Sequence, residues 1–115
     1  MSSQNFINYK EFENLDIRIG TVIEAYEYNE LKKPSIVMKI DFGEKIGTKK
    51  TSAQLQKNYK VDELINKQVI AVLNFEPRQI GKIKSEVLVL GVPDLDSEPV
   101  LLSPDSPVNN GGKLF

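Results

Sequence analysis

The sequence predicts a mostly β protein with short helices, in which five strands close into a small barrel. Five stretches carry strand-like apolar patterns, and one helix-like segment lies between the third and the fourth. Gly20 interrupts the first and longest of these stretches, which indicates a bulge or sharp coil of the kind that a small barrel needs to turn its corner. With 115 residues, the chain is long enough for one domain with a core of its own.

The expected strands differ in how many of their faces are apolar. Residues 36–42 alternate apolar and other side chains, as a half-buried strand does, whereas 69–75 and 87–92 are apolar at nearly every position. A strand that is apolar on both faces needs cover on both. Because a barrel core covers one face only, the other face needs a helix, a terminal extension or a second chain, and we expect a homodimer. The five strands are expected at 15–28, 36–42, 47–53, 69–75 and 87–92.

The segments between the strands complete the predicted architecture. Apolar residues recur at helical spacing in 54–67, which predicts one or two short helices. Five strands with a helix between the third and fourth are typical of the OB-fold, a five-stranded Greek-key barrel. We expect an N-terminal extension at 1–10, a domain at 11–115, and a proline-rich C-terminal extension after Gly91 that includes a short strand at 100–102.

The net charge of −1 conceals a basic middle third. Residues 45–84 hold nine basic and three acidic side chains, a net charge of +6, while the rest of the chain carries −7. Such a segment is either an electrostatic footprint for a phosphate backbone or a solvated face with ion-pair partners elsewhere. An OB-fold binds its ligand across strands two and three, flanked by the 1–2 and 4–5 loops. We therefore expect the scattered cations to converge on that face.

The candidate RNA-binding residues come from these loops and strands. Ser85 and Glu86 have a second interpretation, in which Ser85 satisfies loop backbone groups and Glu86 pairs with Arg78 or Lys84. Asn74, in an otherwise apolar strand, is expected to clamp a neighbouring loop. The candidates are Lys32 and Lys33 in the 29–34 loop, Lys49 and Lys50 in the third strand, Arg78 and Lys82 in the 76–82 loop, and Lys84, Ser85 and Glu86.

Three aromatic residues are possible stacking platforms for bases. Phe42 and Phe75 continue the alternation of core residues in their strands, so both are expected in the core. Tyr59 lies between Lys57 and Lys60 and is the better candidate for stacking.

Several function classes are excluded by residues that the chain lacks. It has no cysteine, histidine or tryptophan, which removes thiolate chemistry, the usual zinc sites and the Ser-His-Asp triad. No phosphate loop, HExxH motif or nucleophile elbow occurs, so we expect no catalysis, no metal and no cofactor. The longest apolar run, 87–90, is too short for membrane insertion, and residues 1–6 show no secretory signal. A cytoplasmic protein is expected.

The chain resembles a known family in several segments. Residues 12–21 (FENLDIRIGT) resemble the opening of the tRNA-binding domain family, and 74–78 (NFEPR) with 80–81 and 84–86 (KSE) resemble its second signature. Other segments resemble one branch, the CsaA-type export-related chaperones. Residues 87–88 are Val-Leu where synthetase-type members have Gly-Met, and the 29–34 loop lacks their His-Pro-Asp-Ala stretch; both departures favour that branch. The segments of the branch are 33–36, 40–43, 46–47, 51–54, 65–72 and 84–91.

The resemblance implies an OB-fold homodimer without enzymatic activity. Members of the family bind tRNA by shape and backbone, and the CsaA branch is described as binding exported preproteins in apolar pockets. It places Lys84, Ser85 and Glu86 beside the RNA face and assigns no individual peptide-binding residue. Two functions follow: a preprotein chaperone with tRNA-binding capacity, or a dedicated binding module for structured RNA. A sugar-binding OB domain is disfavoured because tryptophan is missing.

Overall fold

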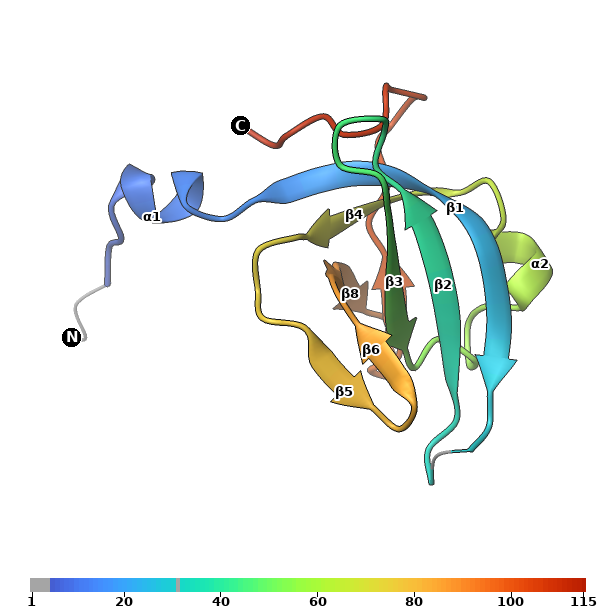
Figure 1. Ribbon diagram of the computed structural model, residues 1–115. Helices are drawn as coiled ribbons and strands as arrows, with labels where there is room; N and C mark the ends of the chain where they lie inside the picture. The colour runs from blue at the N-terminus through green and yellow to red at the C-terminus, as the bar shows by residue number, and fades with distance from the viewer. Residues whose placement is uncertain (1–4, 31) are drawn as a thin grey trace.

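The computed structural model describes residues 5–30 and 32–115, and shows a curled five-stranded antiparallel sheet with two small hairpins attached (Figure 1). Residues 1–4 of the expected N-terminal extension, and Leu31 of the 29–34 loop, lie outside the described residues. The elements are α1 (Tyr9–Glu13), β1 (Ile17–Tyr28), β2 (Ser35–Asp41), β3 (Thr48–Ala53), α2 (Val61–Leu64), β4 (Gln68–Val72), β5 (Arg78–Ile80), β6 (Ile83–Ser85), β7 (Leu88–Val89), β8 (Gly91–Pro93) and β9 (Pro99–Leu101).

The main sheet has the order β3-β2-β1-β4-β7, and β1 is long enough to pair with two neighbours. Its first half pairs with β4 and its second half with β2. The register against β2 shifts between Val22 and Glu24, which is the irregularity that lets β1 curl from one neighbour to the other. Gly20 itself stays in register opposite Val69, so the expected bulge at Gly20 was wrong by a few residues.

Gly20 has a different role, which is close packing. A Cβ atom there would lie 2.5 Å from Ile40 Cγ2 and 2.7 Å from the Phe42 ring. Both residues belong to the side of β2 that fills the barrel, together with Ile36 and Met38. Period-2 placement puts all four on one face, as predicted, although Val37 on the opposite face is buried as well. The core also includes Val22, Leu55, Leu64, Val69, Ala71, Val87 and Leu101.

The barrel closes where β3 meets the chain after β6. The Glu86 N–H donates to the Lys50 carbonyl at 2.8 Å, and Thr51 Oγ1 donates to the Val87 carbonyl at 2.8 Å. These contacts and the five-stranded sheet make up the predicted OB-fold. The C-terminal tail pairs with the remaining free edge of β1, where the Gly111 N–H donates to the Ile19 carbonyl.

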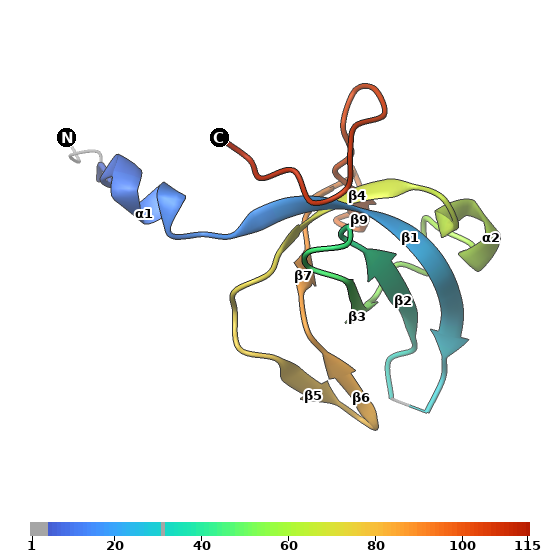
Figure 2. The same cartoon turned by 45° about the horizontal axis from the view of Figure 1, so that its top comes forward.

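The segment 54–67 contains one short helix, the four-residue α2, as predicted, within turns that anchor Leu55 and Leu64 separately in the core. Two other local predictions were wrong. The fifth strand is interrupted after β7, and β8 leaves to pair with β9, which is the short strand predicted near 100–102. The expected 76–82 loop begins a hairpin, β5–β6. Figure 2 shows this hairpin projecting below the sheet, beside the connection between β1 and β2.

Candidate nucleic-acid interface

The β5–β6 hairpin carries most of the candidate residues. Arg78 pairs with Ser85 and Gln79 with Lys84 across the hairpin, and Gly81 and Lys82 form its two-residue turn. Gly81 has φ +60, which is the positive backbone angle that tight hairpin turns require. The turn is fastened to the sheet, because the Lys82 N–H donates to the Tyr28 hydroxyl at 3.0 Å. Tyr28 ends β1, so the hairpin tip lies beside the start of the 29–34 loop.

Ser85 and Glu86 anchor the hairpin to β3. The N–H of Ser52 donates to Ser85 Oγ at 3.1 Å, and the N–H of Lys50 donates to Glu86 Oε1 at 3.0 Å. Ser85 Oγ also lies 3.2 Å from Thr51 Oγ1. The structural interpretation of Ser85 therefore holds, while Glu86 bonds to the β3 backbone and not to Arg78 or Lys84.

The candidate cations fall into two neighbourhoods. Lys50, Arg78, Lys82 and Lys84 are all exposed and lie along β3 and the hairpin. Lys49 does not share this surface, because it pairs with Ile40 and is therefore on the core side of β3, half-buried.

The other neighbourhood lies around the 29–34 loop. Lys32 and Lys33 line a hollow of about 570 Å³ with Lys57, Gln56 and Glu98. Lys57 is a cation that sequence reasoning left out of the candidate list, because nothing local places residue 57 beside residues 32 and 33.

We call the surface that carries Lys50, Arg78, Lys82 and Lys84 the hairpin surface. Its cations have no ion-pair partner within the described chain. The ion pairs found among residues 5–30 and 32–115 are Arg18–Asp16 at 2.6 Å and Lys39–Glu24 at 3.6 Å. Lys50, Arg78, Lys82 and Lys84 thus face solvent without an ion pair among the described residues. The ion-pair partners that the alternative interpretation requires are not found at these four residues.

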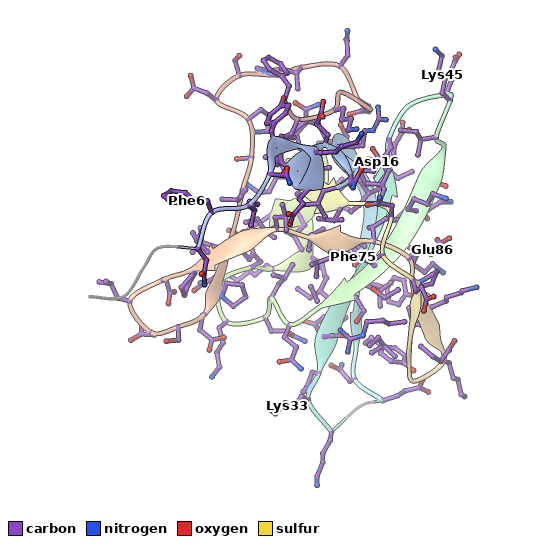
Figure 3. The ribbon with its side chains drawn as sticks, turned by 90° about the vertical axis from the view of Figure 1, so that its left-hand side faces the viewer. Phe6, Asp16, Lys33, Lys45, Phe75 and Glu86 are labelled. Carbon is purple, nitrogen blue, oxygen red and sulfur yellow. The ribbon has the colours of Figure 1, made fainter. Side chains whose placement is uncertain are left out.

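A cavity of about 170 Å³ opens between β3 and the hairpin. Its apolar lining includes Phe75, Ile80, Leu88 and Val89, and its polar lining includes Arg78 and Glu86. Figure 3 shows Phe75 and Glu86 on this side of the molecule, with Lys33 and Lys45 toward opposite ends. Phe75 is 50% exposed, so its expected place in the core was wrong.

Tyr59, the expected stacking candidate, is half-buried, and its hydroxyl accepts the Leu101 N–H at 2.9 Å.

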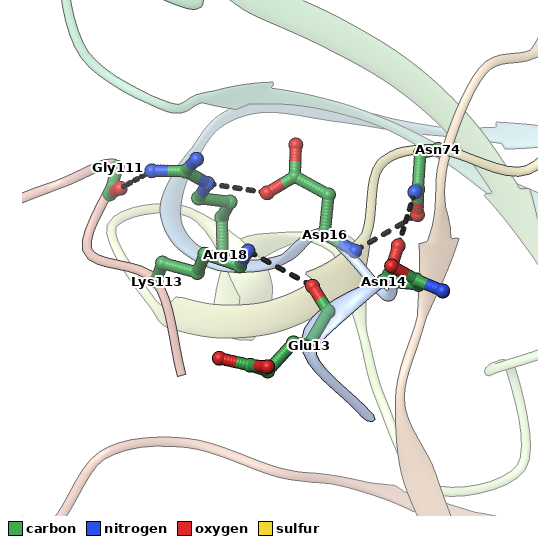
Figure 4. A network of polar contacts seen from close by, with 7 residues as sticks. All are labelled: Glu13, Asn14, Asp16, Arg18, Asn74, Gly111 and Lys113. Carbon is green, nitrogen blue, oxygen red and sulfur yellow. Dashed lines mark hydrogen bonds and ion pairs between the residues drawn. The ribbon is translucent and has the colours of Figure 1, made fainter. Parts of the chain in front are cut away.

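Asn74 fixes the connection that presents Phe75 (Figure 4). Its Oδ1 accepts the Asp16 N–H at 2.9 Å and its Nδ2 donates to the Asn14 carbonyl at 2.7 Å. Asp16 in turn holds Arg18, whose Nη1 donates to the Gly111 carbonyl at 2.9 Å. The predicted clamp is confirmed, although the amide is exposed and not buried. The clamp turns the chain out of β4 before residue 75.

Within residues 5–30 and 32–115, no helix has both the length and the apolar character needed to cross a membrane. The same residues contain no group of three or more acidic side chains arranged to hold a metal ion.

Comparisons with known proteins identify the family. The family model described as "Putative tRNA binding domain" matches residues 17–113. The chain belongs to the tRNA-binding domain family. It is similar over its length to two solved structures. The chaperone CsaA of Bacillus anthracis is 45% identical with a TM-score of 0.88, and the CsaA chaperone of Picrophilus torridus is 47% identical with a TM-score of 0.87. In both comparisons the match covers 96% of this chain and 100% of the other.

The family also occurs as part of larger proteins. The methionine–tRNA ligase of Pyrococcus horikoshii is 36% identical over 109 residues, which are 95% of this chain and 14% of the ligase. This chain therefore spans only 14% of the length of that ligase.

Proposed function

We propose that this protein binds structured RNA, tRNA above all, without catalysing a reaction, and that it also acts as a CsaA-like chaperone of unfolded or exported preproteins. The observation that carries the RNA function is the hairpin surface, with four exposed cations that make no ion pair among the described residues. Phosphates supply the missing charge. Ser85 and Glu86 form the floor of this surface, and Lys32 and Lys33 extend it past the hairpin tip. Lys49, on the other face of β3, is left out of the proposed surface.

Gel-shift titration of tRNA at two salt concentrations tests the RNA function. Each phosphate that is neutralised releases counterions, so the logarithm of the association constant is expected to fall linearly with the logarithm of salt concentration. An affinity that is independent of salt, or no complex at low salt, would contradict it.

The chaperone function is favoured by the full-length similarity to CsaA proteins and by apolar side chains left on the surface. Leu95, Val92 and Val100 are exposed on or beside the β8–β9 hairpin. Light scattering from an aggregating unfolded client tests the chaperone function. The protein is expected to suppress the scattering even at salt concentrations that dissociate the RNA complex, because salt screens apolar contacts little. If RNA binds and the client still aggregates, the protein is a dedicated RNA-binding module.

We propose that the protein is a homodimer. The N-terminal extension, which we place at residues 1–10, includes the start of α1, and Figure 2 shows the described part from residue 5 through α1 extending away from the barrel. Phe6 is 87% and Ile7 71% exposed there. A helix of five residues is not stable alone, so a second copy is the cover that these side chains need. Sedimentation is expected to give twice the chain mass of 13.0 kDa, and the single-chain mass for Phe6→Ser/Ile7→Ser.

We place the protein in the cytoplasm, where it would encounter both tRNA and preproteins that have not yet been exported. Cell fractionation tests this location, and recovery of the protein outside the cytoplasmic fraction contradicts it.

A further inference from the structure

We propose that the cavity between β3 and the β5–β6 hairpin receives a single unstacked base of the bound RNA, and that Glu86 selects bases with an exocyclic amino group. This inference rests on the proposed RNA-binding function and goes one step further, because it assigns a base-reading subsite to a surface otherwise argued from charge. It concerns the interior of the cavity, while phosphates occupy the rim.

The shape and lining of the cavity favour a base. At about 170 Å³ it has room for one planar ring system and not for a folded segment. Phe75 lines it while half of its surface stays exposed, which is the arrangement that single-stranded binders use for stacking. Ile80, Leu88 and Val89 supply the apolar remainder of the wall.

The charges around the cavity favour a nucleotide over an apolar peptide side chain. Arg78 lines the cavity, and Lys84 lies beside it in the same hairpin, opposite Gln79. Lys50 is on the adjoining β3, where its backbone N–H bonds to Glu86. The cavity lining itself holds Arg78 together with the carboxylates of Glu76 and Glu86. A base in the cavity brings its phosphate next to Arg78, with Lys84 and Lys50 on the neighbouring surface, whereas an uncharged peptide leaves these cations unpaired.

Glu86 determines which base fits. Its Oε1 accepts the Lys50 N–H at 3.0 Å, and in the described part of the chain Oε2 has no hydrogen-bond partner. A carboxylate oxygen only accepts hydrogen bonds, so it favours the amino group of cytosine over the O4 carbonyl of uracil. Glu86→Gln keeps an oxygen for Lys50 and replaces the free oxygen with an NH₂ donor, which inverts the preference without removing the anchor.

Fluorescence anisotropy with labelled oligocytidylate and oligouridylate of about eight nucleotides tests the subsite, because that length is within the footprint of one OB-fold. The wild-type protein is expected to bind oligocytidylate more tightly, and Glu86→Gln to abolish or reverse this preference. Phe75→Leu retains apolar bulk but loses the ring, and is expected to weaken both oligomers about tenfold. Phe115→Ala, which truncates a fully exposed aromatic at the C-terminus, is the matched control and is expected to change nothing.

A measurement on the unmodified protein complements the variants. Stacking of a base in the cavity is expected to shift the methyl NMR signals of Leu88 and Val89 through the ring current, and those of Ile7 not at all. If the wild-type protein binds tRNA in a salt-dependent manner but these signals stay in place and both variants match it, the subsite is wrong and the RNA function stands. If no RNA binds at low salt, both fail. If Phe75→Leu lowers the affinity for an apolar peptide and leaves RNA affinity unchanged, the cavity is a peptide site and the proposal is overturned.

Discussion

Lys50 and Glu86 hold each other through two reciprocal hydrogen bonds, although 36 residues separate them. The Glu86 N–H donates to the Lys50 carbonyl at 2.8 Å, and the Lys50 N–H donates to Glu86 Oε1 at 3.0 Å. One bond is between backbones, and the other depends on the identity of residue 86. The same carboxylate therefore helps to close the barrel and lines the cavity that we assign to a base.

Removing that carboxylate is expected to loosen the seam between β3 and the hairpin. Glu86→Ala leaves the exposed Lys50 N–H without its acceptor, which costs about 1 kcal/mol because water can replace part of the lost charged hydrogen bond. Urea denaturation measures the loss. Glu86→Gln retains an oxygen at the same position and is the control, expected within about 0.5 kcal/mol of the wild-type protein. Equal destabilisation by both variants would show that charge, and not the hydrogen bond, matters at this seam.

Gly20 is expected to tolerate no side chain. In Gly20→Ala the new methyl group would lie 2.5 Å from Ile40 Cγ2 and within 2.8 Å of the Phe42 ring, both fully packed in the core. Overpacking of this kind costs about 2 kcal/mol or more. The matched control is Gly112→Ala, since a Cβ there would approach nothing closer than the Asn109 carbonyl at 3.6 Å. Thermal melting of the two variants is expected to separate them by about 8 °C or more, and coincident melting curves would show that β1 and β2 can move apart at little cost.

The parts of the fold that could be predicted are those in which neighbours in sequence carry the signal. In β2 the alternation of Ile36, Met38 and Ile40 with other residues is enough to define the strand and its buried face, because side chains of a strand point to opposite sides in turn. The same argument failed for Phe75. Phe75 is an even number of residues from Val69 and Ala71, so a continuous strand would place all three side chains on the same face. However, β4 ends at Val72, and this alternation does not apply beyond the end of a strand.

The cause of that ending lies 58 residues earlier in the chain. Asn74 binds the backbone at Asn14 and Asp16, and this contact turns the chain away from the core. Sequence reasoning identified Asn74 as a clamp but had no means to find the direction in which the chain leaves it. Likewise, the basic composition of 45–84 indicates an anion-binding surface, while the assignment of Lys50 to it and of Lys49 to the other side depends on the register with β2.

Asp94 is expected to make stability depend on acid pH. Hydrogen bonds from the Asn58 side chain, and then from the backbone N–H groups of Glu98 and Asp96, lower the pKa of Asp94 from its ordinary value of 3.8. Because the folded-state pKa is the lower one, this stabilisation is present above pH 3.8 and is lost as the pH falls through the folded-state pKa.

Urea midpoints measured from neutral pH downward test this. Asp94→Asn is expected to be less stable than the wild-type protein at neutral pH, and the gap is expected to close below pH 3.8. Asp105→Asn, at an exposed aspartate whose side chain makes no hydrogen bond within the described residues, is the control and is expected to show no such gap. A difference between wild type and Asp94→Asn that stays constant across the range would mean that the loop at Asp94 is held by shape and not by the carboxylate.

The hairpin cations are expected to set the salt dependence of RNA binding. In Arg78→Ala/Lys84→Ala two exposed charges on opposite strands of one hairpin are removed, and neither has an ion-pair partner among the described residues to lose. If each neutralises one phosphate, the slope of log affinity against log salt becomes shallower by roughly 0.7 to 0.9 per charge. Gel shifts of tRNA over a salt series measure it.

The control for this charge effect removes the same net charge elsewhere. Lys60 immediately precedes α2, on the far side of the barrel from the hairpin in Figure 1, and Lys45 lies toward the end opposite Lys33 in Figure 3. Lys45→Ala/Lys60→Ala is therefore expected to leave the slope unchanged, because counterion release depends on phosphates contacted and not on total charge. If both double variants flatten the slope equally, the long-range field of the whole molecule drives binding, and the hairpin is not its specific surface.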